Sequence, residues 1–226
     1  MLLRVAIVVA AAALFFTACN DGPNYAKRMG DDEVNLEAMV LANSDMPVDF
    51  LKRQEKGFDN EEWSQVFDTN DPEAKKSQLD AQGRLRNHVA YFSWEQPMEH
   101  LGHPISVTTQ STLYVDAQSA ERAAKQFACG LLVADTDPIN EFKVPKLGDQ
   151  SVGFFVTQQQ QNFGTTVDTA VCFRTGRILH AIVQSGLEGT SDVALSVKLA
   201  EKMLARVDAV YAGKPMPTEA VADTQG

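Results

Sequence analysis

Three cysteines occur in the chain, and the first, Cys19, directly follows an apolar stretch near the N-terminus. Residues 1–4 carry one positive charge, residues 5–16 are apolar, and two small residues precede the cysteine. The apolar run is shorter than the ~20 residues of a membrane-spanning helix, but its length suits the core of a signal peptide. The segment Phe16-Thr17-Ala18-Cys19 resembles a bacterial lipobox, whose cysteine thiol forms a thioether to diacylglycerol. The sequence therefore predicts acylation of Cys19 and attachment to a membrane through that lipid.

Two other interpretations of the N-terminus stay open: a secretory signal followed by a coincidental cysteine, and an uncleaved membrane anchor. All three place the rest of the chain outside the cytoplasm, in the cell envelope. Removal of residues 1–18 takes away one basic residue, Arg4, so the formal net charge moves from −10 to −11. Because an acidic surface repels phosphate backbones, we expect no nucleic-acid partner.

The other two cysteines, Cys129 and Cys172, lie far apart in the sequence. In an oxidising compartment an isolated pair of cysteines favours one disulfide. The alternative is two buried thiols that are not joined, since free cysteine is among the most buried residue types. If the two are bonded to each other, neither is a good candidate for a nucleophile.

Histidines raise the question of a metal site. The spacing His100-Leu101-Gly102-His103, with two glutamates nearby, offers the ligand types that zinc prefers. Gly102 and Pro104, however, prevent a regular helix that would place both imidazoles on one face. A polar loop is the better interpretation, and we expect neither a metal ion nor another cofactor.

Catalytic motifs are also lacking in the sequence. His180 lies in the apolar run 178–183, where a half-buried, hydrogen-bonded histidine is more common than a general base. We find no GxSxG, HExxH, phosphate-binding loop or dinucleotide-binding pattern. The two tryptophans, Trp63 and Trp94, are expected in the core. We therefore do not expect an enzyme.

One group of basic side chains is a candidate for binding an acidic ligand or partner. Arg84, Arg86 and His88 alternate at the start of a predicted strand, so all three are expected on one face. An arginine guanidinium presents a fork of donors to carboxylates. The alternative is a solvated or salt-bridged face of the sheet, which needs no ligand.

The elements that carry these residues follow from periodicity and from turn signals. Asp71-Pro72 predicts a helix start, and Asp116 a second one that leads to Cys129. A long amphipathic helix is predicted from about residue 193, with Thr190 or Ser191 as its N-cap. Alternation of apolar and polar residues, or runs rich in Val, Phe and Tyr, predict strands at 50–56, 86–95, 105–115, 141–146, 152–158, 167–174 and 177–184.

Strands in runs, with helices before, between and after them, indicate an α+β fold: an antiparallel sheet with helices packed on it, closed by a C-terminal amphipathic helix. We divide the chain into a signal peptide (1–18), a lipidated cysteine with a flexible tether (19–32), a single α+β domain (33–212) and a disordered tail (213–226).

The stretch from about Ile105 to Val210 resembles the PknH-type family of extracellular sensor domains, which occur on mycobacterial receptor kinases and in related lipoproteins. The resemblance rests on the strand end Leu113–Ala117 with its alanine-rich helix, on Val171-Cys172-Phe173-Arg174, and on the terminal helix. It implies a Cys129–Cys172 disulfide and a sensor-like domain outside the cytoplasm. The second disulfide of the family has no counterpart here, and no kinase region is present.

These inferences together predict a cell-envelope lipoprotein whose domain senses or binds a small ligand or an envelope protein without catalysis. A structural or assembly factor of an envelope complex is the alternative. An enzyme or a metal-binding protein is less favoured.

Overall fold

The computed structural model describes residues 24–25, 29–67, 70–126, 129, 139–160 and 164–214. The predicted signal peptide, Cys19 and the tail from residue 215 lie outside the described residues, so their roles stay predictions. Among the described residues, no helix combines the length and apolar character needed to cross a bilayer.

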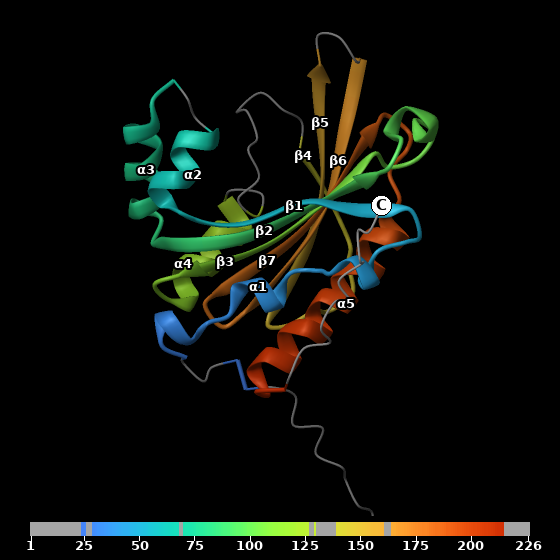
Figure 1. Cartoon of the computed structure of the whole chain (residues 1–226). Coiled ribbons are helices and arrows are strands. Elements are labelled where there is room, and N and C mark those ends of the chain that lie inside the picture. Colours follow the sequence, from blue (N-terminus) through green and yellow to red (C-terminus); the bar gives the residue numbers. More distant parts are fainter. Residues whose placement is uncertain are drawn as a thin grey trace, which may run out of the picture.

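A single antiparallel sheet is the centre of the fold (Figure 1). Within the described residues it has seven strands in the order β1-β2-β3-β7-β6-β5-β4. The predicted α+β class is confirmed, although β4 ends at Phe142, so the strand predicted over 141–146 is displaced toward the N-terminus. The strands are β1 (Phe50–Asp59), β2 (Arg84–Trp94), β3 (Ser106–Tyr114), β4 (Ile139–Phe142), β5 (Gln150–Gln160), β6 (Gly164–Thr175) and β7 (Ile178–Leu187).

Side-chain caps start the main helices. The carboxylate of Asp71 accepts a hydrogen bond from the Ala74 amide at 3.0 Å, and Asp116 accepts one from Ser119 at 2.7 Å. Both helix starts were predicted. The helices are α1 (Leu36–Met39), α2 (Asn60–Phe67), α3 (Pro72–Ala81), α4 (Ala117–Gln126) and α5 (Val193–Tyr211), with short 3-10 turns η1 (Asp31–Glu33), η2 (Asn43–Asp45) and η3 (Pro97–His100).

The cap of α5 differs from the prediction. Asp192, rather than Thr190 or Ser191, accepts the hydrogen bond from the Leu195 amide, at 2.9 Å. The hydroxyl of Thr190 instead donates to the Leu187 carbonyl at 2.8 Å. Thr190 is therefore engaged in the turn that follows β7, and the helix starts after Asp192.

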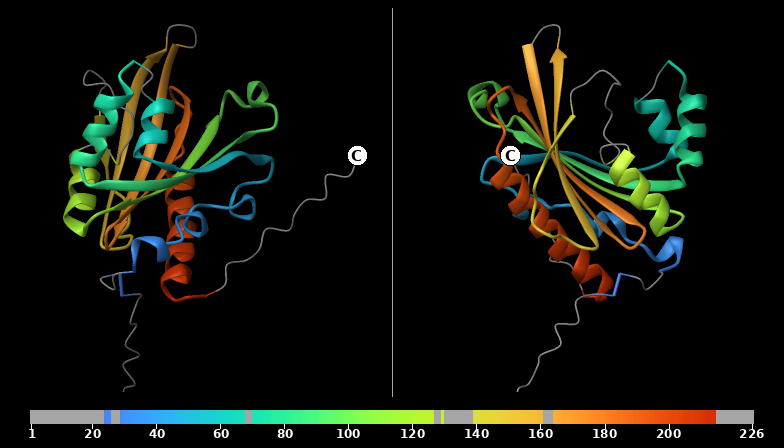
Figure 2. Two further views of the ribbon diagram at one scale, coloured as in Figure 1. Left: turned by 60° about the vertical axis from the view of Figure 1, so that its left-hand side comes forward. Right: turned by 180° about the vertical axis from the view of Figure 1, so that it is seen from behind.

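The sheet lies between two unequal layers of helices (Figure 2). On one face α5 and α1 cover the main core, which includes Phe92, Phe173 and Ile182. On the other face α4 packs on β3, β6 and β7, while α2 and α3 pack on β1 and β2. Two smaller apolar clusters lie under those helices, one with Leu179 and Ala181 and one with Phe58 and Trp63.

Part of the predicted tether contacts the domain. The guanidinium of Arg177 donates to the Met29 carbonyl at 2.8 Å, and that of Arg86 donates to the Asp31 carbonyl at 2.7 Å. The sequence predicts a flexible tether over residues 19–32. The structure instead binds residues 29–32 to the sheet, because two buried or half-buried arginines need acceptors and these backbone carbonyls supply them.

Candidate functional site

A groove of about 470 Å³ lies on the face of the sheet opposite α5. Its lining crosses the sheet from β1 to β5, and α2 contributes to one side. Because side chains alternate along a strand, Thr108 and Gln110 of β3 line the groove, while their neighbours Val107 and Thr109 are fully buried toward α1 and α5. Among the described residues, the groove is thus the part of this face that helices leave uncovered.

Aromatic and aliphatic side chains form the wall of the groove near β1, β2 and α2. The rings of Phe58 and Trp63 meet edge to face, with centroids 5.4 Å apart. The guanidinium carbon of Arg84 lies 4.9 Å from the Trp63 ring centroid and so packs against this ring. Tyr91, by contrast, is 37% exposed in the groove. This wall offers an apolar surface that is held rigid from behind.

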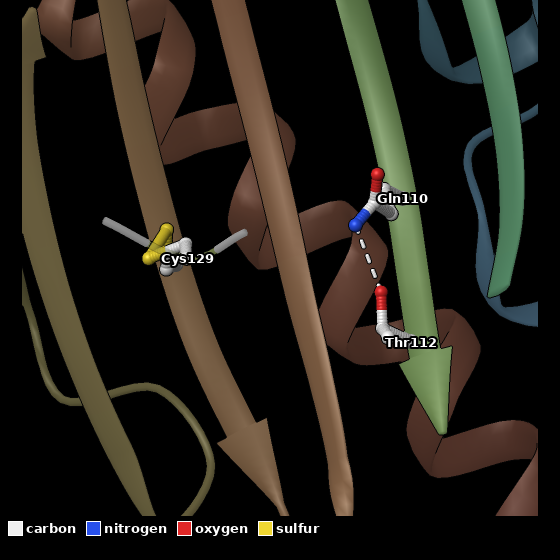
Figure 3. The surroundings of a disulfide bond; sticks show 4 residues. Gln110, Thr112 and Cys129 are labelled. Atoms are coloured by element: carbon white, nitrogen blue, oxygen red, sulfur yellow. Dashed lines mark hydrogen bonds between the residues drawn. A yellow bond between two sulfur atoms is a disulfide. The ribbon is translucent and has the colours of Figure 1, made fainter. Parts of the chain in front are cut away.

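The floor, on β3, β7, β6 and β5, combines polar side chains with two aliphatic side chains of β7. The side-chain amide N–H of Gln110 donates a hydrogen bond to the hydroxyl of Thr112 at 2.8 Å. Figure 3 shows that its carbonyl oxygen then points away from Thr112. Thr108 and Ser185 add hydroxyls to the lining. The floor therefore presents an oriented acceptor together with groups that both donate and accept hydrogen bonds.

The predicted disulfide is confirmed and belongs to this site. Cys129 and Cys172 are joined, with their Cα atoms 6.1 Å apart, and both are buried. In Figure 3 the bridge lies on the same side of the sheet as Gln110 and Thr112, with α5 behind the strands. Cys129 lines the groove and has a φ of 67°, a conformation that L-residues rarely adopt. The bridge fixes this strained residue against β6 as part of the groove wall.

The groove carries one charged residue of each sign among the described residues that line it, Lys56 on β1 and Asp168 on β6. The ammonium of Lys56 lies 4.8 Å from the Phe58 ring centroid and 3.4 Å from a carboxylate oxygen of Glu62. Four strand-to-strand steps, about 19 Å of sheet, separate β1 from β6. The lining as a whole is therefore close to neutral and does not select for a strongly charged ligand.

Arg84, Arg86 and His88 do not share one face, so that expectation was wrong. The pairing of β2 with β3 shifts between Arg84 and Arg86, and this irregularity reverses the alternation. Arg84 bonds to the amide oxygen of Asn60, on the side of α2. Arg86 and His88 lie on the opposite face, where His88 meets a carboxylate oxygen of Glu55 at 3.2 Å.

Each of these three side chains has a partner within the protein. Burial lowers the pKa of Arg84 to about 10, which still leaves it charged at neutral pH. The hydrogen bond from His88 is the largest of the effects that lower the pKa of Glu55, and this carboxylate also forms an ion pair with Lys52 at 2.6 Å. Arg86 serves backbone carbonyls near the N-terminus. Binding of an acidic group by the three together stays a prediction, and the geometry does not bring them to one place.

His100, one of the two histidines of the possible metal motif, has a packing role. The ring of His100 stacks on Trp94, with centroids 4.1 Å apart. In the described part of the chain no three histidine, cysteine, aspartate or glutamate side chains are grouped to hold a metal ion. Trp94 packs against the main core as predicted, whereas Trp63 both packs in a cluster and lines the groove.

His180 and Ser111 have the spacing of a nucleophile and its base, with 2.9 Å between the hydroxyl and Nδ1. Both residues are 0% exposed, and the second ring nitrogen meets the Thr175 hydroxyl at 2.8 Å. Burial lowers the pKa of His180 to about 3, so the ring is neutral. A substrate would have to enter the core to reach this pair, which therefore acts as a buried hydrogen-bond network.

Sequence reasoning did not find the groove residues. The alternation in β3 indicated a half-buried strand, and its polar positions, among them Thr108 and Gln110, were attributed to a side facing solvent. Whether these residues line a groove depends on the order of the strands beside β3, which is β7, β6 and β5. Polar residues on the same face of several neighbouring strands would indicate such a groove, but they can be identified only when the strand order is known.

The chain has been compared with family models, with curated proteins and with solved structures. No family model and no curated protein matches the chain. Among solved structures, the extracellular domain of PknH from Mycobacterium tuberculosis aligns with a TM-score of 0.49 and 10% sequence identity. The alignment covers 81% of this chain and 98% of that one, and so extends beyond residues 105–210. Function does not follow from a likeness of this degree.

Proposed function

We propose that this chain is a lipid-anchored envelope protein whose domain binds a small ligand in the groove, without catalysis, outside the cytoplasm. The observation that carries the proposal is the groove itself: about 470 Å³, with an apolar wall, a polar floor and a position between packed helices. Pockets for small molecules are commonly of this size and combine apolar walls with a few placed polar groups.

The N-terminal sequence and the disulfide support the location. The leader and Cys19 match the pattern of an exported lipoprotein. The Cys129–Cys172 bridge is of the kind that persists in oxidising compartments and is rare in the cytosol. Both observations favour a domain held at the outer side of a membrane by its lipid.

The lining favours a ligand that is uncharged or zwitterionic and has distinct apolar and polar sides. Its apolar side would lie against Tyr91 and Val89, and its polar side would meet Gln110 and Ser185. A ligand with no polar groups would leave the floor unpaired, which costs free energy. A strongly anionic or cationic ligand would find no excess of opposite charge in the groove.

A structural or assembly role, the alternative, needs a large apolar patch for a partner protein. The most exposed large apolar side chains of the described residues lie on separate elements: Val48 before β1, Val66 in α2, Met98 in η3 and Ile139 in β4. Only Val66 of these lines the groove, and the other three lie on separate elements, so we favour a small ligand in the groove over a protein partner on a flat apolar patch.

Native mass spectrometry of the mature protein, released gently from its own envelope, tests the proposal. We expect the wild type to carry a bound small molecule. Ser185→Trp fills the polar end of the groove with an indole and is expected to abolish this added mass. Ser191→Trp is the matched control, because Ser191 is exposed and lies before α5, away from the groove lining.

The two variants separate the outcomes. Retention of the ligand by Ser191→Trp and its loss from Ser185→Trp, with unchanged circular dichroism, would support the groove as the site. A wild type without any bound small molecule would count against ligand binding. A ligand that persists in Ser185→Trp would move the site elsewhere.

A further inference from the structure

The N-terminal strap, defined as the described residues 24–25 and 29–34, is fastened to one end of the sheet. We call this end the base; it carries the β6–β7 turn at Gly176 and the C-terminal end of α5. In Figures 1 and 2 the blue N-terminal segment and the end of α5 lie side by side.

Tyr25 makes the first attachment. Its hydroxyl donates to the carboxylate of Asp208, and its ring meets Tyr211 edge to face, with centroids 5.2 Å apart. Gly176 has a φ of 58°, and a β-carbon there would collide with the carbonyl oxygen of Tyr25. The turn is thus shaped for close approach of the strap backbone.

Two arginines make the second attachment. Arg177, which is largely buried, donates to the Met29 carbonyl and forms an ion pair with Asp31 at 2.5 Å. Arg86 donates to the carbonyls of Asp31 and Val34 at 2.7 and 2.8 Å. Because these guanidinium groups are half-buried or buried, release of the strap would cost them acceptors in a poorly solvated place.

Six residue steps separate Cys19 from Tyr25, so the chain between them spans at most about 20 Å. Ser185, at the far end of the groove, lies eight residues along the chain and β7 from Arg177, about 27 Å. The lipid attachment point is therefore tied to the base, and the groove lies on the part of the sheet that extends away from it.

We propose that the strap orients the anchored domain, so that the base faces the lipid bilayer and the groove opens toward the water beyond. The inference rests on the proposed lipidation of Cys19. It identifies the base as the membrane-facing surface and presents the groove to solutes rather than to the bilayer.

Energy transfer between a labelled domain and labelled lipid headgroups tests this orientation. The full lipidated protein is placed in phosphatidylcholine vesicles that contain a headgroup-linked acceptor. A donor is attached at Ala212→Cys, which is exposed beside Tyr211, or at Met98→Cys in η3. Met98 follows the end of β2, a strand that runs about 34 Å from Arg84 near the base to Trp94. We expect severalfold more efficient transfer from position 212 than from position 98.

Release of the strap is the second arm. Tyr25→Ala combined with Asp31→Ala removes the polar side-chain contacts of the strap with Asp208 and Arg177 but keeps the bonds from Arg86 and Arg177 to its backbone carbonyls, so we expect the strap to loosen and the difference between the two transfer efficiencies to shrink. Asp32→Ala is the matched control, since Asp32 is exposed and adjacent, and it should keep the difference. A difference that is as large in the double variant as in the wild type would overturn the role of the strap.

Flotation with the vesicles separates the two levels of the proposal. A chain that does not float lacks the lipid anchor, and both the anchor and the orientation fall. A chain that floats but transfers equally from positions 98 and 212 keeps its anchor and overturns the orientation alone.

Discussion

His180 is a titratable group that the fold keeps neutral. Its ring contacts the hydroxyls of Ser111 and Thr175 and stacks on Phe173, and burial lowers its pKa to about 3. In the unfolded chain a histidine has a pKa of about 6.5, so below that pH the unfolded state binds a proton that the folded state does not. The associated stability is complete above about pH 6.5 and is lost as pH falls toward 3.

We therefore expect the free energy of unfolding to fall by about 2 kcal/mol between about pH 7.5 and about pH 5 because of His180 alone. Urea denaturation at both pH values measures it. His180→Gln, which keeps a donor and an acceptor, should be less stable overall but should lose this part of the pH dependence. An identical pH dependence in the variant and the wild type would show that His180 is not the group responsible.

The disulfide closes a loop with a sequence separation of 43 residues. Chain entropy in the unfolded state then contributes about 4 kcal/mol to stability, and release of the positive φ at Cys129 offsets about 1 kcal/mol of it. We expect Cys129→Ala with Cys172→Ala to lose about 3 kcal/mol in urea denaturation. Reductant should lower the stability of the wild type but leave the double variant unchanged. A wild type that reductant does not affect, even in urea, would mean that the bridge is absent.

At the scale of elements, the N-cap of α5 is a clear test of how well the structure places a helix start. Replacement of Asp192 by Ala removes the acceptor for the Leu195 amide and is expected to cost about 1 kcal/mol. Ser191→Ala, one residue earlier, should change stability by less than about 0.5 kcal/mol. Thermal unfolding of the two variants measures the difference. A larger loss of stability in Ser191→Ala than in Asp192→Ala would show that Ser191 is the N-cap.

Helix starts and strands were largely predictable because their signals are local. Asp71 and Asp116 cap helices as their sequence context indicates, and β3 and β7 match the predicted ranges within a few residues. The positions of Arg84 and Arg86 on opposite faces of the sheet were not predictable, because the shift in register depends on how β2 pairs with β3. A one-residue irregularity moves a side chain to the other face of the sheet, and the local sequence does not predict where such an irregularity occurs.

At the scale of the whole molecule, the two faces of the sheet have different roles. The face under α5 is filled by the main core and carries the stability of the fold. The opposite face is covered by α4 on one side and by α2 and α3 on another, and between them lies the groove. The sequence predicted helices on a sheet, but the uncovered part depends on strand order and on long-range contacts that periodicity does not encode.

Binding in the groove is the central claim, and methyl NMR tests it most directly. The protein is labelled at alanine and valine methyls and titrated with a small-molecule extract of its own envelope. We predict shifts at Val89, Ala181 and Val183, which line the groove, and none at Val48, which is 85% exposed elsewhere. Shifts that gather at residues outside the groove, or no shifts at saturating extract, would contradict the account.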